Sequence, residues 1–322
     1  MVGYVKPLTY IAFSVLLLIG GVMQTAAEPV KIVSYNVENL FHPENDSITD
    51  DEEWTPEGAR RWSFTRYYRK EENIARVLTN IGEWDGVDVV GLQEVENALV
   101  VKRLCNTLRR GEYDFVHYDS PDRRGIDVAL IYKKSRIETL GTRAIKVDLG
   151  TLTTRDILYV CAQVDKRDTV HFFVCHMPSQ RGGSAESAWK REAATQVLQN
   201  AVDSVFAVCP NANIIVMGDM NSEEIRVNGL KDKLAKSQQP RTNSQQGTHK
   251  YQGRWSFLDH FYVSPAVDSI SEASVYDAEW IQETDEKYLG LKPKRTYNGF
   301  KYQNGYSDHL PIVLMIGMKN EQ

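Results

Sequence analysis

The chain has 322 residues, of which 42% are hydrophobic and 25% charged, enough for one large domain or two small ones with a real core. Its net charge of −5 leaves no basic excess, which argues against a protein that binds nucleic acid tightly without regard to sequence. An enzyme whose basic residues gather on one face remains compatible with this composition.

The N-terminal segment predicts a secretory signal. Lys6 precedes an almost wholly apolar run from Leu8 to Met23, and Thr25-Ala26-Ala27 supplies the small residues that suit a signal peptidase. Cleavage after Ala27 is favoured over an uncleaved membrane anchor, because the run is short for a membrane span. We therefore expect an exported protein, periplasmic or secreted, with a single domain over residues 28–322 and no later membrane segment.

Strand-like and helix-like segments alternate through the rest of the chain. In chain order, strands are predicted at 32–37, 87–92, 126–132, 157–164, 169–175, 214–217, 258–263 and 312–315, and helices around 74–81, 98–108 and 188–205. This alternation, without a linker, predicts an α/β or α+β sandwich.

Two further features bear on the fold. The polar stretch 231–253 is interpreted as a long surface loop between two motifs, with a disordered insertion as the alternative. The four cysteines contain no C-x-x-C pair, which argues against a zinc site, and buried thiols are favoured over disulfides.

Four short polar blocks lie at the ends of predicted strands. Gly218-Asp219-Met220-Asn221 follows one apolar run and Ser307-Asp308-His309 precedes another, while 33–38 and 91–95 each carry an acid at the end of a strand. Alone, each block has the composition of an ordinary turn or loop. Together they place acids, amides and an imidazole where α/β folds bind ligands, which predicts a divalent-metal site for phosphoryl transfer.

The residue types suit hydrolysis of a phosphodiester. This reaction needs a metal that neutralises phosphate charge, a group that activates water, and donors to the transition state. Asp219 suits activation of the water and Asn221 its positioning. His309 suits donation to phosphate if an acid orients the ring, for which Asp259 is the candidate, and His176 is a second donor at a strand end.

The ordered motifs resemble those of a known superfamily, the metal-dependent endonuclease/exonuclease/phosphatase enzymes. The resemblance runs from about Val30 to Ile316 and is carried by Asn36, Gln93-Glu94, His176, Gly218-Asp219-x-Asn221, Asp259 and Ser307-Asp308-His309. It implies a four-layer α/β sandwich with two central β-sheets flanked by helices.

The resemblance also implies roles for these residues. Glu94 would bind Mg²⁺ or Mn²⁺, with Asn36, Glu38 and Asp308 close by or bound through water. Asp219 would activate the attacking water, and Asn221 would hold that water or the phosphate. Asp259 would pair with His309, and both His309 and His176 would contact the phosphate.

Basic residues outside these motifs are candidates for binding substrate. Arg124 and Asp127 lie in a block, 123–130, that resembles a secreted bacterial branch of the superfamily. Arg181 and Arg191 are candidates for contacts with substrate phosphates, and ordinary solvated arginines are the alternative. His260 stands where the resemblance leads us to expect an aromatic or hydrophobic residue.

The sequence is compatible with three interpretations of what the protein acts on or binds. A nuclease is favoured by a basic and aromatic cluster, although a packed amphipathic helix explains the same residues: Arg60, Arg61, Trp62, Arg66, Tyr67, Tyr68, Arg69 and Lys70. A phosphatase or phosphodiesterase for a small or lipid-linked phosphate ester is the second interpretation, and an inactive binding protein is the third. We expect a monomer.

Overall fold

The computed structural model describes residues 28–180, 183–223, 233–236, 247–269 and 273–317. The predicted signal, residues 1–27, lies outside the described part of the chain. Among the described residues, no helix has both the length and the apolar character needed to cross a membrane.

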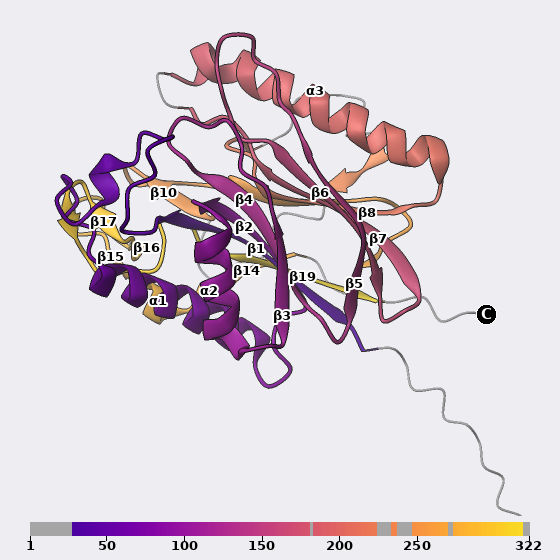
Figure 1. The fold of residues 1–322 in the computed structure, drawn as a ribbon, viewed down its shortest axis with the longest axis horizontal. Helices are drawn as coiled ribbons and strands as arrows, with labels where there is room; N and C mark the ends of the chain where they lie inside the picture. The colour runs from indigo at the N-terminus through magenta and orange to yellow at the C-terminus, as the bar shows by residue number, and fades with distance from the viewer. Residues whose placement is uncertain (1–27, 181–182, 224–232, 237–246, 270–272, 318–322) are drawn as a thin grey trace, which may run out of the picture.

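Two large mixed sheets form the centre of the molecule (Figure 1). The first sheet has the order β13-β19-β1-β2-β4-β3, with β14 also paired to β19. Its strands are β1 (Val30–Leu40), β2 (Val89–Val95), β3 (Tyr113–His117), β4 (Asp127–Lys133), β13 (Asp268–Ser269), β14 (Ser274–Val275) and β19 (Ile312–Gly317). Only the pair of β1 and β2 is parallel in this sheet.

The second sheet has the order β5-β6-β7-β8-β12-β9. Its strands are β5 (Ile137–Ile145), β6 (Ile157–Val164), β7 (Asp168–His176), β8 (Asn213–Asp219), β9 (Ala235–Lys236) and β12 (Asp259–Val263). The pair of β7 and β8 is parallel, and the other pairs are antiparallel.

Helices cover the outer faces of both sheets. The helices α1 (Phe64–Gly82) and α2 (Ala98–Arg109) lie on the first sheet, and α3 (Ser184–Val208) lies on the second (Figure 1). The inner faces of the sheets pack against each other, because β1, β2 and β4 contact β6, β7 and β8. The predicted four-layer sandwich is confirmed.

Local sequence explains where the first two helices begin. The Ser63 hydroxyl accepts a hydrogen bond from the Arg66 amide at the start of α1, and the Asn97 side chain accepts from two amides at the start of α2. The apolar residues of α1 recur at helical spacing, so one face of the helix packs into the core: Tyr67, Ile74, Val77, Leu78 and Ile81 are buried.

Three short hairpins extend the ends of the sheets near the site described below. They are β10 (His249–Tyr251) with β11 (Arg254–Ser256), β15 (Gln282–Thr284) with β16 (Leu291–Pro293), and β17 (Tyr297–Asn298) with β18 (Lys301–Tyr302). Two short 3₁₀ helices, Glu52–Trp54 and Glu279–Ile281, complete the described elements.

The sequence did not reveal β3 and β5, which form edges of the two sheets. Both strands have largely exposed or half-buried side chains, so they lack the buried apolar run that marks an inner strand. The interpretation of 231–253 as one loop is wrong at 235–236 and 249–251, which are strands; residues 237–246 lie outside the described part.

The cysteines are free thiols rather than disulfides. Cys105 and Cys175 are buried as expected and Cys161 is partly buried, but Cys209 is exposed at the end of α3. Cys161 pairs with His171 across the sheet, so it does not face Cys175.

Candidate active site

Strand ends from both sheets meet at one edge of the sandwich. Parallel pairing aligns Asn36 of β1 with Gln93 of β2, and His176 of β7 with Asp219 of β8. Since the ends of parallel strands lie at the same edge, polar residues that are distant in sequence become neighbours. Asp259 joins them because β12 pairs with β8 in a register that sets it opposite Asp219.

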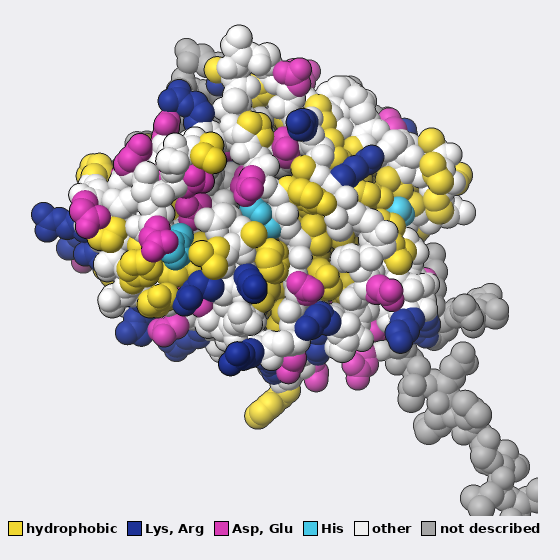
Figure 2. All heavy atoms as spheres, viewed as in Figure 1, with side chains coloured by type: hydrophobic (Ala, Val, Ile, Leu, Met, Phe, Trp, Pro, Cys, Tyr) yellow, Lys and Arg dark blue, Asp and Glu magenta, His cyan; other side chains and the backbone are white. Residues whose placement is uncertain are grey.

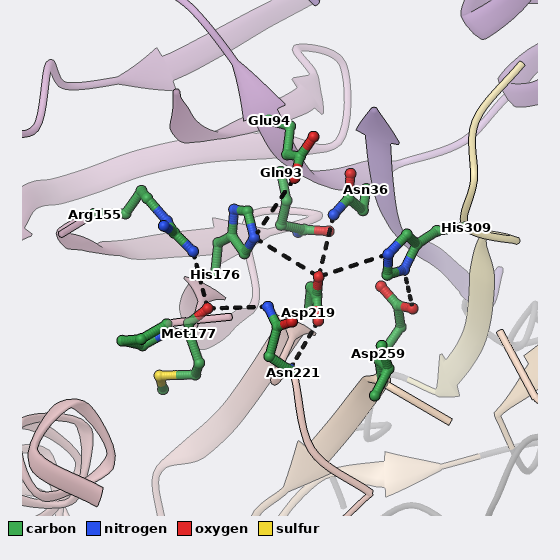
Figure 3. A network of polar contacts seen from close by, with 12 residues as sticks. Asn36, Gln93, Glu94, Arg155, His176, Met177, Asp219, Asn221, Asp259 and His309 are labelled. Carbon is green, nitrogen blue, oxygen red and sulfur yellow. Dashed lines mark hydrogen bonds and ion pairs between the residues drawn. The ribbon is translucent and has the colours of Figure 1, made fainter. Parts of the chain in front are cut away.

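The carboxylate of Asp219 is the centre of the cluster (Figure 3). Its Oδ2 accepts a hydrogen bond from Asn36 Nδ2 at 3.1 Å, and lies 3.7 Å from His176 Nε2 and 3.8 Å from His309 Nε2. Burial, with help from the nearby Asp259 charge, raises the pKa of Asp219 to about 7. The structure thus gathers an acid, an amide and two imidazoles around one oxygen atom.

Asp259 orients the ring of His309. Its Oδ2 lies 2.8 Å from His309 Nδ1 and also accepts the Thr248 hydroxyl at 2.6 Å. Burial opposes a charge on His309, but the carboxylates of Asp259 and Asp219 hold the pKa of this imidazole well above its usual value. His260 points elsewhere, with its Nε2 2.9 Å from the Ser222 carbonyl, because successive strand residues face opposite sides.

Asn221 is held in place by the main chain. Its Nδ2 donates to the Met177 carbonyl at 3.0 Å, and its backbone amide donates to Asp219 Oδ1 at 2.8 Å. The buried guanidinium of Arg155 donates to the same Met177 carbonyl at 2.9 Å. Arg155 is a structural partner of the site that the sequence analysis did not identify.

Strained backbone occurs at several of these strand ends. Glu38, Asn39, Glu94 and Asn221 have φ angles of 52°, 58°, 66° and 47°, a region that residues with a side chain rarely adopt. Such strain persists where surrounding structure enforces it and is enriched at functional sites. Gly218 has a φ of 142°, and an added Cβ would lie 1.9 Å from the Cys175 carbonyl oxygen, which explains the glycine before Asp219.

Three acids lie beside this cluster. Glu94 Oε2 accepts the Asn39 amide at 3.0 Å, and its Oε1 is 3.8 Å from His176 Nε2. Arg295 joins the other two acids, since it contacts Asp308 Oδ2 at 2.6 Å and Glu38 Oε1 at 3.4 Å.

These two acids have opposite pKa shifts. Burial and the charge of Asp308 raise the pKa of Glu38 to about 7. Burial also acts against ionisation of Asp308, but Arg295 and His309 lower its pKa to about 2. The carboxylates suit Mg²⁺ or Mn²⁺, so the donor set fits a divalent cation.

His249 is a further nitrogen donor that the sequence did not indicate. It pairs with His309 through an isolated β-bridge, and the two ring centroids are 4.8 Å apart. One ligand atom each from His249, Asp308 and His309 lies within 4.8 Å of the others. Burial and the charge of His309 lower the pKa of His249 to about 4.

Of the three arginines predicted to bind substrate, the structure describes Arg124 and Arg191, and both contact groups of neighbouring segments. Arg124 lies beside Asp122, with its Nε 3.7 Å from the carboxylate. Arg191 donates to the Pro178 carbonyl at 3.3 Å and to the Ser187 hydroxyl at 2.9 Å. Arg181 lies outside the described residues.

The basic and aromatic cluster at 60–70 is partly packed into the fold, and Arg61, Tyr68 and Arg69 are exposed. Trp62, Tyr67 and Lys70 are buried, and Lys70 Nζ donates at 2.5 Å to both the Thr296 hydroxyl and the Tyr306 carbonyl. Burial lowers the pKa of Lys70 to about 8. α1 is therefore the amphipathic helix of the alternative interpretation, with Tyr68 and Arg69 on its exposed face.

Comparison with known proteins places the chain in a family. The model of the Endonuclease/Exonuclease/phosphatase family matches residues 31–318, so the chain belongs to this family. No curated protein matches the sequence. Members of the family are phosphoester hydrolases, in agreement with the reaction class predicted from the motifs.

Solved structures with similar folds are distant in sequence. An endonuclease/exonuclease/phosphatase family protein from Bacteroides thetaiotaomicron has a TM-score of 0.61 at 17% identity, covering 91% of this chain and 100% of that one. A mannosyl-6-phosphatase from Bacteroides thetaiotaomicron VPI-5482 has a TM-score of 0.60 at 16% identity, covering 90% and 100%. TDP2 from Caenorhabditis elegans has a TM-score of 0.58 at 15% identity, covering 90% and 75%. At these identities the likeness establishes the fold.

Proposed function

We propose that the protein is an exported phosphoesterase that depends on Mg²⁺ or Mn²⁺ and hydrolyses phosphodiester bonds of nucleic acids. The main support for this proposal is the set of contacts around Asp219, in which a buried carboxylate meets an amide and two imidazoles. Membership of the endonuclease/exonuclease/phosphatase family supports the reaction class.

Asp219 has the geometry of a general base. One of its oxygens is oriented by Asn36 and the other by the Asn221 amide, so the carboxylate is fixed before substrate arrives. In the proposed reaction it takes a proton from water, and the Asn221 side chain positions that water or the phosphate. The water then attacks phosphorus in line with the leaving oxygen.

The imidazoles supply donors to the phosphate. His309, charged because Asp259 and Asp219 favour its protonated form, donates through Nε2 to a phosphate oxygen. His176 donates from the opposite side of Asp219. Donors fixed in a buried site stabilise the charge that develops in the transition state.

The acids nearest to these groups are the proposed cation ligands. Glu94 is the principal one, with Asn36, Glu38 and Asp308 close by or acting through water. A bound divalent cation neutralises phosphate charge and polarises the phosphorus–oxygen bonds. Arg295 holds the side chains of Glu38 and Asp308 in place for this role.

An exposed tyrosine favours a substrate that carries bases. Tyr251 is 65% exposed and lies two residues after His249 on β10, so both side chains are on the same face of the strand. The ring of His249 lies against that of His309. Tyr251 is therefore positioned to stack a base next to the reacting phosphate.

A small phosphate ester is the second candidate, favoured by the distribution of charge. On the face seen in Figure 2, Lys and Arg side chains are interspersed with Asp and Glu and form no continuous basic tract. In the cluster at 60–70, Lys70 is buried and Arg60 and Arg66 are half-buried, which leaves Arg61 and Arg69 as its exposed cations. A long polyanion would gain less from such a surface than a short substrate would.

The deciding experiment measures Mg²⁺- and Mn²⁺-dependent hydrolysis by residues 28–322 against a panel of substrates. The panel holds plasmid DNA, single-stranded DNA, RNA, an aryl phosphodiester, inositol phosphates, a sugar 6-phosphate and sphingomyelin. Asp219→Ala is the control and should lose at least roughly a hundredfold in rate, the usual contribution of a general base.

Each result has a defined meaning. Metal-dependent cutting of nucleic acid that the variant lacks would support the nuclease. Turnover of small esters alone would select the second candidate, and equal rates for the variant would refute the role of Asp219. Export is tested separately, by fractionating cells and sequencing the mature N-terminus, which should begin at Glu28.

A further inference from the structure

A second group of cation donors lies away from the Asp219 cluster, where β3 ends and β4 begins. His117 is the last residue of β3 and Asp127 the first of β4, and Asp119 lies in the loop between them. One ligand atom each from these three residues lies within 4.8 Å of the others.

His117 and Asp127 form a close, buried ion pair. Nε2 of His117 lies 3.3 Å from Asp127 Oδ2, yet this nitrogen has no hydrogen-bond partner among the described residues. Both side chains are almost fully buried, 2% and 5% exposed. A buried donor or acceptor without a well-formed hydrogen bond is destabilising, so such an atom needs an explanation.

The spacing of the two atoms suits two ligands of one cation. Nitrogen and oxygen ligands lie about 2.1 Å from an ion such as Zn²⁺, and two of them at about 100° are about 3.3 Å apart. Asp127 Oδ1 is already satisfied by the Ser120 amide at 3.1 Å and by the Ser120 hydroxyl. Oδ2 is therefore the oxygen that remains for a cation.

A second buried carboxylate, that of Asp156, lies near Asp127. Asp127 and Asp156 both line a small pocket at the seam between the two sheets. Asp156 is 7% exposed and its Oδ1 has no hydrogen-bond partner among the described residues.

We propose that His117, Asp119 and Asp127 form an accessory site for a divalent transition-metal cation such as Mn²⁺ or Zn²⁺, with Asp156 adding negative charge beside it. One imidazole with carboxylates is a donor set that such ions accept. Asp119 is 88% exposed, so it closes the site from the solvent side.

The accessory cation would fix the loop 118–126, whose two ends carry its ligands. The loop also contains Asp122, which binds Arg155 at 3.1 Å, and Arg155 in turn holds the Met177 carbonyl that positions Asn221. Asp127 also pairs with Val95, the residue after Glu94. The accessory site thus stabilises the frame of the catalytic site without touching substrate.

The test counts bound Mn²⁺ by the loss of the free-ion EPR signal from the purified protein. The wild type should bind two ions and the Glu94→Ala/Asp308→Ala variant one. Adding His117→Phe to that variant should remove the remaining ion. His171→Phe is the matched control, because His171 is a half-buried histidine bonded to Tyr159 away from this site, and it should leave both ions bound.

Two further readouts separate loss of the ion from loss of the fold. In the Glu94→Ala/Asp308→Ala variant, the bound Mn²⁺ should show nitrogen coupling in pulsed EPR, which reports imidazole coordination. Asp119→Asn changes an exposed carboxylate and should weaken this ion about tenfold while leaving the metal-free melting temperature unchanged.

The proposal is overturned if the Glu94→Ala/Asp308→Ala variant binds no Mn²⁺, or if adding His117→Phe to that variant leaves its bound Mn²⁺ in place. A bound ion without nitrogen coupling would equally refute it. Because none of these measurements uses turnover, they stand independently of whether the protein cleaves nucleic acid.

Discussion

Replacing Asp259 by Asn tests whether the Asp259–His309 pair is part of the catalytic machinery. The exchange keeps the size of the side chain and an oxygen that can face His309 Nδ1, at present 2.8 Å from Asp259 Oδ2. It removes the charge that stabilises the imidazolium. The ring therefore stays near its position, but its protonated form becomes less favourable.

The magnitude follows from the type of hydrogen bond. A hydrogen bond to a charged group contributes about 1.5–3 kcal/mol and a neutral one about 1 kcal/mol, so the exchange costs about 1–2 kcal/mol. This corresponds to roughly a 5- to 30-fold loss in kcat/KM near neutral pH. The loss should remain below that of His309→Gln, which removes the whole donor and should cost about 10²- to 10⁴-fold.

The effect should grow with pH. In the wild type, Asp259 and Asp219 hold the pKa of His309 well above its usual value, so the protonated ring persists at alkaline pH. Asp259→Asn lowers that pKa, and activity that needs the imidazolium is then lost at lower pH. The ratio of wild-type to variant rates should therefore rise between about pH 6 and pH 9.

The assay is the initial rate of hydrolysis of a chromogenic aryl phosphodiester at saturating Mg²⁺. Thr248→Val is the matched control, because it removes the 2.6 Å hydroxyl bond to Asp259 but leaves the carboxylate charge. It should lower activity without changing the pH profile. A pH-independent ratio near one for Asp259→Asn would refute the reasoning.

Three other changes give independent tests. Burial raises the pKa of Glu96 to about 8. The stability that its protonated carboxyl contributes is therefore complete below about pH 4.5 and is lost as pH rises through 8. Glu96→Gln should match the wild-type melting temperature near pH 4 and exceed it near pH 8. Gly218→Ala places a Cβ 1.9 Å from the Cys175 carbonyl oxygen at a φ of 142°, and urea unfolding should show a loss of about 3 kcal/mol or more. Tyr251→Ala should raise KM for a single-stranded oligonucleotide about 5- to 100-fold while Tyr251→Phe does not, and an unchanged KM would contradict base stacking.

The sequence determined the inner strands and the polar blocks at their ends. The run 214–217 is apolar because both faces of this inner strand are buried, and this pattern is local. Gly218 and Asp219 follow such a run directly, so their place at the edge of the sheet could be predicted without any long-range contact.

Other features depended on packing between distant segments. The amphipathic pattern of α1 indicates a buried face, but nothing in it shows that Lys70 reaches Thr296 and Tyr306 rather than solvent. Arg295 and His249 lie on or beside short hairpins that contact Asp308 and His309 only in the folded chain.

The candidate site also combines features that the sequence predicts with features that depend on the tertiary structure. Residue types and their order along the chain are local information, and they predicted which side chains gather at the strand ends. Distances, burial and the direction in which Asp259 and His260 point are set by strand register and by the packing of one sheet on the other. Only the tertiary structure therefore decided that Asp219 is the centre of the cluster and that His117 and Asp127 form a second group of donors.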